Sequence, residues 1–289
     1  MTVMINLIKR NLKLFFRDRV SVFFSLLSVF IIIGLYVLFL GNMMTDNFRD
    51  LLGINTRFTI DSWIMAGILS VTSITATMGA FQIMVEDSTK MISKDFLSAP
   101  LKRSQLVGGY IISSFIIGVI MSIAALVLAE IYILAGGGEL LELMALLKLL
   151  GVMLISVFAG SSMVFFMVSF FKSSSAFATA STILGTLIGF ITGIYIPIGS
   201  LPSTIQTVIK IFPISHSAVL FRQIMMEVPI SESFANAPLQ AIAGFKEAMG
   251  VVFLFGGKEM SPLTSLLILA ATGIIFLALS IVNISIKKK

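Results

Sequence analysis

The sequence predicts an all-α polytopic membrane protein with six transmembrane helices, an N-terminal interfacial helix and short re-entrant helices on the outer side. Of the 289 residues, 57% are hydrophobic and 12% are charged, whereas a soluble domain carries about 25% charged residues. Charge-free stretches recur at the roughly 20 residues that a helix needs to cross a bilayer. Lys and Arg gather in alternate connecting segments. This composition excludes an ordinary soluble enzyme, a disordered chain and, despite the net charge of +6, a nucleic-acid binder.

Six spans are expected, at about residues 20–40, 62–85, 104–129, 149–171, 173–196 and 262–286. The fifth charge-free stretch runs further, but Pro197 and Pro202 interrupt it, because proline breaks a helix. The first span is not expected to be a cleavable signal peptide, since its apolar run is too long and no small-residue cleavage site follows. We therefore expect one transmembrane domain over residues 1–289, with a cytoplasmic loop at 86–103 and an external loop at 197–261.

The placement of basic residues predicts the orientation. With a cytoplasmic N-terminus, the inner segments hold 13 of the 20 Lys and Arg residues but four of the 14 Asp and Glu residues. Cytoplasmic loops are enriched in Lys and Arg, so both termini are expected on the cytoplasmic side. The protein itself is expected in the plasma membrane. Residues 4–19 have apolar and basic faces at helical spacing, which is typical of a helix in the headgroup layer. A simple basic flank of the first span is the compatible alternative.

The cytoplasmic loop mixes charged and apolar residues. In a short helix Ile92 and Phe96 would stack on one face, and Pro100 would end that helix. An exposed apolar ridge among charges is typical of a docking surface for a soluble partner; a loop folded back on its own protein or on lipid is the alternative. The residues expected to dock are Glu86, Asp87, Lys90, Met91, Ile92, Phe96, Leu97 and Pro100.

Hydroxyl residues and glycines mark the second and fifth spans. Glycines spaced four residues apart let helices approach closely. Ordinary packing within the chain would explain this pattern; the more specific hypothesis places the fifth span at a subunit interface and, with the second, along a translocation route. The residues concerned are Thr72, Thr75, Thr182, Gly185, Thr186, Gly189 and Gly193.

The sequence predicts neither a catalytic residue nor a metal site. It has no cysteine and one histidine, His216, and it lacks the G-x-x-x-x-G-K-[ST] nucleotide motif. Glu130 ends the third span, and we expect a structural role for it, with ion coupling as the alternative. Beyond the fifth span two short helices are expected, at about 203–212 and 215–227, and then a looser loop with one short helix at most.

These features together resemble the permease subunit of a type-2 ATP-binding-cassette (ABC) exporter. The loop that opens with Glu86 and closes with Leu97-Ser98-Ala99-Pro100-Leu101 is similar to the family's acid-to-L-x-x-P-L segment. The exit of the fifth span, Pro197-Ile198-Gly199-Ser200-Leu201-Pro202, resembles the family's P-x-x-x-L-P region, and Phe212-Pro213 and then Phe221-Arg222 follow it. The long, glycine-bearing external loop before the last span departs from the pattern.

The resemblance implies a homo- or heterodimer of permeases in the lipid bilayer, each docked on a cytoplasmic ABC ATPase. That partner would hold the ATP and magnesium, so this chain would need no cofactor and would not be an enzyme. The segment 86–100 would be the coupling helix, and the helices around Pro197, Pro202 and Pro213 would close the pathway on the outside. Alternating access would export an amphiphile such as a drug, an antimicrobial peptide or a lipid-like molecule.

An ion-coupled secondary transporter remains the main alternative, although it would usually have more spans, internal repeats and intramembrane charges. A membrane-embedded enzyme or sensor is a further one, but no catalytic constellation supports it. Dependence on a separate nucleotide-binding subunit would distinguish the ABC exporter hypothesis from both alternatives.

Overall fold

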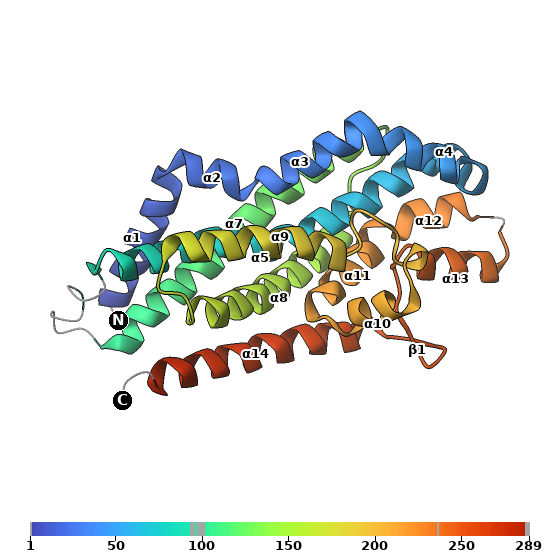
Figure 1. Cartoon of the computed structure of the whole chain (residues 1–289). Coiled ribbons are helices and arrows are strands. Elements are labelled where there is room, and N and C mark those ends of the chain that lie inside the picture. Colours follow the sequence, from blue (N-terminus) through green and yellow to red (C-terminus); the bar gives the residue numbers. More distant parts are fainter. Residues whose placement is uncertain (1, 93–95, 97–101, 236, 287–289) are drawn as a thin grey trace.

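The computed structural model describes residues 2–92, 96, 102–235 and 237–286, and nearly all of its regular structure is helical (Figure 1). The first half contains α1 (Thr2–Arg17), α2 (Arg19–Ser25), α3 (Leu27–Leu35), the π-helical turn η1 (Tyr36–Leu40), α4 (Gly41–Leu52), the 3₁₀ turn η2 (Gly53–Asn55), α5 (Thr56–Thr89) and α7 (Arg103–Ala135). The second half contains α8 (Leu143–Val168), α9 (Ser174–Ile191), the 3₁₀ turn η3 (Ile198–Ser200), α10 (Ser203–Ile211), α11 (Pro213–Met225), α12 (Glu227–Ser233), α13 (Leu239–Ala248), β1 (Leu254–Phe255), β2 (Lys258–Glu259) and α14 (Pro262–Ile286).

Five helical stretches among the described residues are long and apolar enough to cross a membrane. They are Met43–Thr89, Ser104–Ala135, Leu143–Val168, Ser174–Ile191 and Pro262–Asn283. They contain or largely overlap the predicted spans 62–85, 104–129, 149–171, 173–196 and 262–286. The pair α10 and α11, bent by 90°, passes the same test as one broken span. The structure thus confirms a polytopic, all-helical membrane protein.

The predicted first span at 20–40 is not one continuous helix. The chain there is divided into α2, α3 and η1, with Leu26 at the first junction. The Ser25 hydroxyl donates to the carbonyl of Val22 at 2.7 Å, a side-chain bond that competes with helix continuation. At η1 a Cβ on Gly41 would lie 2.8 Å from the carbonyl oxygen of Tyr36, so the π-helical turn requires glycine there. Hydropathy carries no information about such breaks.

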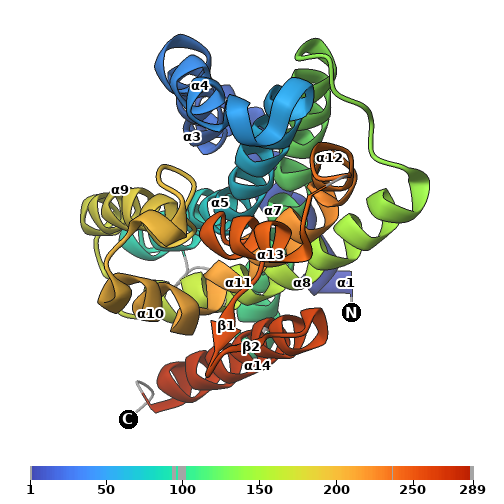
Figure 2. The same ribbon diagram turned by 90° about the vertical axis from the view of Figure 1, so that its right-hand side faces the viewer.

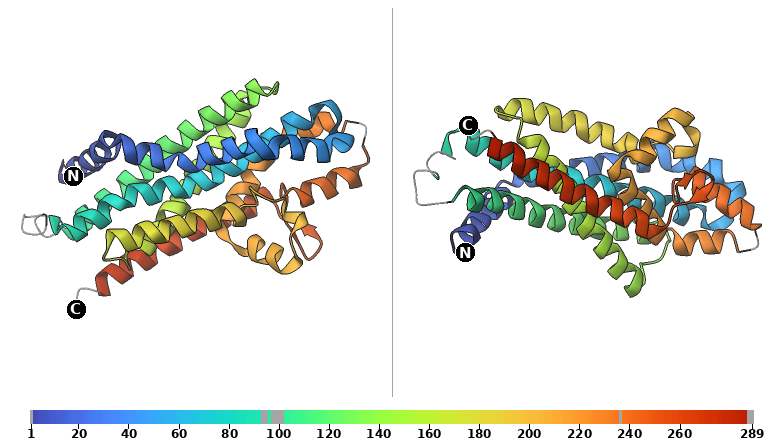
Figure 3. Two further views of the ribbon diagram at one scale, coloured as in Figure 1. Left: turned by 45° about the horizontal axis from the view of Figure 1, so that its top comes forward. Right: turned by 90° about the horizontal axis from the view of Figure 1, so that it is seen from below.

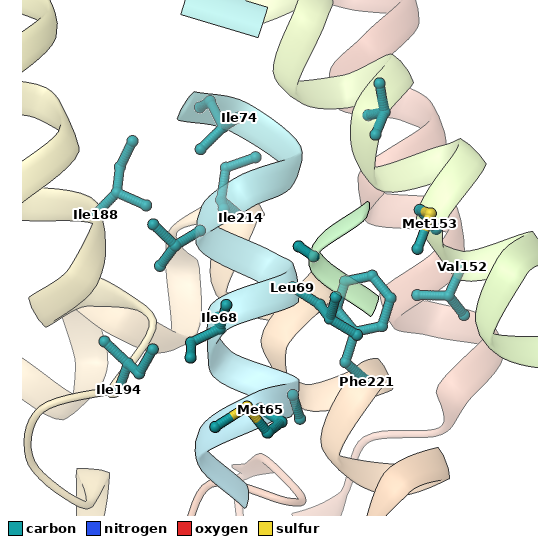
Figure 4. Close-up of a cluster of buried hydrophobic side chains, with 14 of the residues drawn as sticks. Met65, Ile68, Leu69, Ile74, Val152, Met153, Ile188, Ile194, Ile214 and Phe221 are labelled. Atoms are coloured by element: carbon teal, nitrogen blue, oxygen red, sulfur yellow. The ribbon is translucent and has the colours of Figure 1, made fainter. Parts of the chain in front are cut away.

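Helix α5 is the central element, with other helices around it (Figure 2). It is buried along most of its length, with α9 on one side and α7 and α8 on the other. Figure 4 shows Met65, Ile68 and Leu69 of α5 between Ile188 and Ile194 on one side and Val152 and Met153 on the other. Because α5 is buried on all sides, its apolar residues are distributed around the helix and form no single amphipathic stripe.

The external segment is more ordered than the sequence predicts. The expected helices at 203–212 and 215–227 are present as α10 and α11, but the region after them contains α12, α13 and an antiparallel hairpin instead of a loop with one short helix at most. Phe245 of α13 packs against Phe234 and against Phe48 of α4, with ring centres 5.1 and 6.1 Å apart. These aromatic contacts join two distant segments into one cap. Figure 3 shows this cap at the end of the molecule opposite α1 and the end of α14.

Candidate functional site

A groove of about 530 Å³ lies between α2, α3, α5 and α9. Thr75 of α5 and Thr182, Gly185 and Thr186 of α9 all line it. Four residues predicted from two separate spans to line a pathway are therefore brought together. Gln82, about two turns before the last residue of α5, lines the same groove.

The groove wall combines hydroxyl and amide side chains with apolar ones, and none of its side chains is charged. The hydroxyls of Thr75, Thr182 and Thr186 donate to carbonyls one turn earlier in their own helices, at 3.0 to 3.1 Å. The donor of each hydroxyl is thus used, while its oxygen can still accept a hydrogen bond. Ser181 has a buried Oγ without a partner in the described part of the chain. Such a wall can bind amines, amides or hydroxyls without the free-energy cost of desolvating a charged side chain of its own.

Three predicted pathway residues pack inside the chain. Thr72 is 1% exposed and donates to the carbonyl of Ile68. A Cβ on Gly189 would lie 2.5 Å from the ring of Tyr195, and Gly193 has a φ of +66° where the chain leaves α9. The glycines therefore serve close packing within the chain, and contact between α9 and a second subunit stays a prediction.

The outward face of α9 is apolar and exposed. Ile183, Leu187 and Phe190 are 56%, 49% and 50% exposed, and these three side chains recur at helical spacing. In a membrane such a face can contact lipid or another subunit equally well. The groove opens beside this face.

At the C-terminal end of α5, α1 is bound to α5 and α7 by a partly buried ionic cluster. Arg10 donates two hydrogen bonds to the Asp87 carboxylate, at 2.6 and 2.8 Å, and Tyr110 donates a third at 2.6 Å. Asn11 donates to Ser113 at 3.1 Å. Asp87 holds the pKa of the Arg10 guanidinium above its ordinary value, through its hydrogen bonds. We call Arg10, Asp87 and Tyr110 the base clamp.

The clamp changes how the predicted docking residues are interpreted. Asp87 is buried in it, so its carboxylate is used inside the chain. Phe96 lies against Arg10, whose guanidinium carbon is 5.1 Å from the ring centre. Sequence reasoning found the basic helix and the acidic loop separately and missed their pairing, because the two residues are 77 positions apart.

The other docking residues lie nearer the surface. Glu86 and Lys90 form an exposed pair at 3.2 Å, Met91 is 57% exposed, and Ile92 lines a small cavity with Arg10. Met91 has a φ of +63°, where α5 gives way to the loop. Leu97 and Pro100 lie outside the described residues.

The three predicted outer-gate prolines stand at element boundaries. Pro197 precedes η3, Pro202 precedes α10, and Pro213 is the first residue of α11. Proline is favoured at a helix start because its fixed φ suits the first turn, and because an N–H at that position would have no partner within the helix. Pro213 follows the 90° bend between α10 and α11.

A buried cation, which the sequence analysis named in the family resemblance without assigning it a role, stabilises the region around α11. Arg222 of α11 is completely buried and donates to the carbonyls of Gly193 and Gly250 at 3.0 and 3.5 Å. Trp63 of α5 stacks on it and donates to Met249 at 2.7 Å. Arg222 thus connects the end of α9, α11 and the segment after α13. A lone arginine in an apolar stretch was the available signal.

His216 and Glu130 have structural partners. His216 is buried and shares a 3.1 Å hydrogen bond with Ser265 of α14. One Glu130 oxygen accepts from the backbone N–H of Leu141 at 3.1 Å.

Comparison with known proteins agrees with this architecture. A family model described as ABC-2 family transporter protein matches residues 55–282. Among curated proteins, none matches the chain significantly. Because the matched region covers α5 through most of α14, which is well over half of the chain, this chain belongs to the ABC-2 family of membrane transport proteins.

Proposed function

We propose that the chain is the permease subunit of an ATP-driven exporter, works as a dimer, and moves an amphiphilic substrate out of the cell by alternating access. The observation that carries the proposal is the continuity of α5. This one 34-residue helix carries Thr75 and Gln82 in the groove and Glu86 and Lys90 beside the docking segment. A shift imposed at its cytoplasmic end is therefore transmitted to the groove wall.

The base clamp supports such transmission. Helix α1 cannot move independently of α5 while Arg10 and Asp87 share two charge-assisted hydrogen bonds, which are among the stronger ones in proteins. Arg10 also contacts Phe96 of the docking segment. A partner ATPase bound there would move α1 and α5 together, with ATP and magnesium held by that partner.

The groove supports an amphiphile as the substrate. Its hydroxyls accept hydrogen bonds, while Leu27, Ile31 and Met78 supply apolar contacts. A drug, an antimicrobial peptide or a lipid-like molecule has this mixed character. Both termini would lie in the cytoplasm, and α10 and α11 would re-enter the plasma membrane from outside to close the route.

Co-purification from native membranes tests the proposal, followed by an ATPase assay on whatever accompanies the tagged chain. The sharpest variant is Met91→Asp, because Met91 is exposed and aspartate tolerates its left-handed backbone better than methionine. It should abolish capture of the ATPase without loss of folded permease. Phe96→Asp with Leu97→Asp should do the same, although it also disturbs Arg10.

Phe255→Asp, on the exposed outer hairpin, is the matched control and should leave capture unchanged. Normal capture by Met91→Asp would contradict the docking assignment. A folded chain without any ATPase partner, whose transport follows an ion gradient, would favour the ion-coupled alternative.

A further inference from the structure

A second cavity, of about 410 Å³, lies at the outer end of the molecule between the α7–α8 turn and the α11–α12 turn. It shares no lining residue with the groove and lies on the opposite side of α5. Five charged side chains line it: Glu130, Glu139, Glu142, Glu227 and Lys148. Its formal charge is therefore negative, in a chain whose net charge is positive.

Two buried polar atoms of its lining residues have no hydrogen-bond partner in the part of the chain that the structure describes. Ser62 is completely buried and its Oγ is unpaired. Glu130 has one oxygen paired with Leu141, while its Oε1 is buried and unpaired. Buried polar groups without partners are rare because each one costs free energy. A ligand that supplies N–H donors would satisfy both.

The remaining wall is apolar, with Phe58, Ile133 and Met225 among its members. Within residues 2–92, 96, 102–235 and 237–286, no group of three or more His, Asp or Glu side chains is arranged to hold a metal ion. The carboxylates are thus spread around an apolar space and do not converge on a point. That arrangement suits an organic cation with a hydrocarbon body.

We propose that this cavity binds the protonated amine of an amphiphile, with the ammonium group between Glu130 and Ser62 and the chain against the apolar wall. This proposal is independent of the exporter function. The alkylammonium can come from a free amphiphile or from an aminophospholipid of the outer leaflet, since both carry the same group.

Trp63, the only tryptophan of the chain, follows Ser62 directly and provides a reporter. The probe is 4-bromobenzylammonium, whose short, rigid body keeps the bromine that quenches indole fluorescence close to the ammonium group, added to full-length protein in a neutral maltoside detergent. Quenching should be saturable, and 4-bromobenzyl alcohol should quench weakly and without saturation. Loss of the charge-assisted contact in Glu130→Gln should raise the apparent Kd about tenfold.

Glu259→Gln, on exposed strand β2 outside the cavity, is the matched control and should bind as the unaltered protein does. A triple change of the exposed carboxylates, Glu139→Gln, Glu142→Gln and Glu227→Gln, keeps the test valid if Glu130→Gln does not fold, and should also weaken binding. Equal saturable quenching by the alcohol, or unchanged affinity in the carboxamide variants, would overturn the proposal.

Added phosphatidylethanolamine separates the two sources. If the lipid competes with the probe, the ligand is the lipid headgroup. If the lipid does not compete and quenching stays saturable, the ligand is a free amphiphile. Capture of the ATPase is measured on the same preparations, so failure of the exporter proposal and failure of the cavity proposal remain distinguishable.

Discussion

The guanidinium of Arg222 lies over the indole of Trp63, its central carbon 4.9 Å from the ring centre, and both side chains are completely buried. No ion pair is found for Arg222 among the described residues. Backbone carbonyls and an aromatic face replace the carboxylate that a buried arginine usually requires. One planar cation therefore joins the end of α9, α11 and the segment after α13.

Arg222→Lys should destabilise the protein by about 2 kcal/mol, because an ammonium is not a planar fork that can stack on Trp63 while donating to Gly193 and Gly250. Thermal unfolding in detergent measures the loss. The emission of Trp63, the single tryptophan, should change in the folded variant as well. Arg49→Lys on exposed α4 should change neither quantity, and an Arg222→Lys protein as stable as this control would contradict the assigned role.

The base clamp predicts a specific non-additivity. Arg10→Gln should cost about 2 kcal/mol, because it leaves the Asp87 carboxylate buried with Tyr110 as its remaining partner. Once Arg10→Gln is present, Asp87→Asn should cost much less than it does alone. Unfolding of the two single variants and the double variant measures the coupling. Lys13→Gln on the same helix is the control, and additive effects of Arg10 and Asp87 would show that the pair is energetically unimportant.

Close packing of α5, α7 and α8 depends on Gly118. A Cβ there would lie 2.7 Å from Thr77 of α5 and 2.7 Å from Val157 of α8. Gly118→Ala should therefore destabilise by about 1–3 kcal/mol, the usual cost of overpacking. Gly151→Ala on α8, where a Cβ would meet nothing within 4 Å, should be neutral or slightly stabilising. Equal unfolding midpoints for these two variants would contradict the packing.

Hydropathy predicted most of the fold because the bilayer imposes a minimum length on apolar helices. The orientation that the basic residues indicate stays a prediction. Span 262–286 and helices α10 and α11 were located within a few residues. Local features that override hydropathy were missed, such as the break at Leu26 and the π-helical turn before Gly41. The external helices α12 and α13 were missed because their order comes from contacts with distant residues such as Phe48.

The same division applies to the candidate site. Thr75, Thr182 and Thr186 could be singled out because polar side chains stand out in an apolar run whatever their partners; the structure brings them to one groove, and their role in a pathway stays a prediction. The pairing of Arg10 with Asp87, and of Arg222 with Trp63, could not, because a single sequence does not show which distant side chains meet. Gly189 is a site of close approach within the chain, because a Cβ there would lie 2.5 Å from the ring of Tyr195, whereas a Cβ on Gly185 would meet Thr75 at an ordinary 3.8 Å. A role for either glycine at a subunit interface stays a prediction.

Met91 stores backbone strain at the end of α5. A side chain at a φ of +63° costs roughly 1–2 kcal/mol, and glycine avoids this cost while losing more entropy on folding. Met91→Gly should therefore raise stability by up to about 1 kcal/mol, whereas Met91→Ala should bring no gain. The unfolding midpoints of the two variants test this prediction. Higher stability in both would indicate that removal of the methionine side chain, and not relief of backbone strain, is responsible.

The exposed face of α9 predicts where two copies of the chain meet in a homodimer. The chain has no cysteine, so a single introduced thiol reports only on its own position. Leu187→Cys, in the middle of this face, should form a disulfide-linked dimer on mild oxidation in membranes, because a residue near the axis of a two-fold interface lies close to its own copy. Ile275→Cys on α14 is equally apolar and 55% exposed, and should remain monomeric if α14 faces lipid. Crosslinking through Ile275 and not through Leu187 would move the interface to α14, and would leave the groove beside α9 open to lipid.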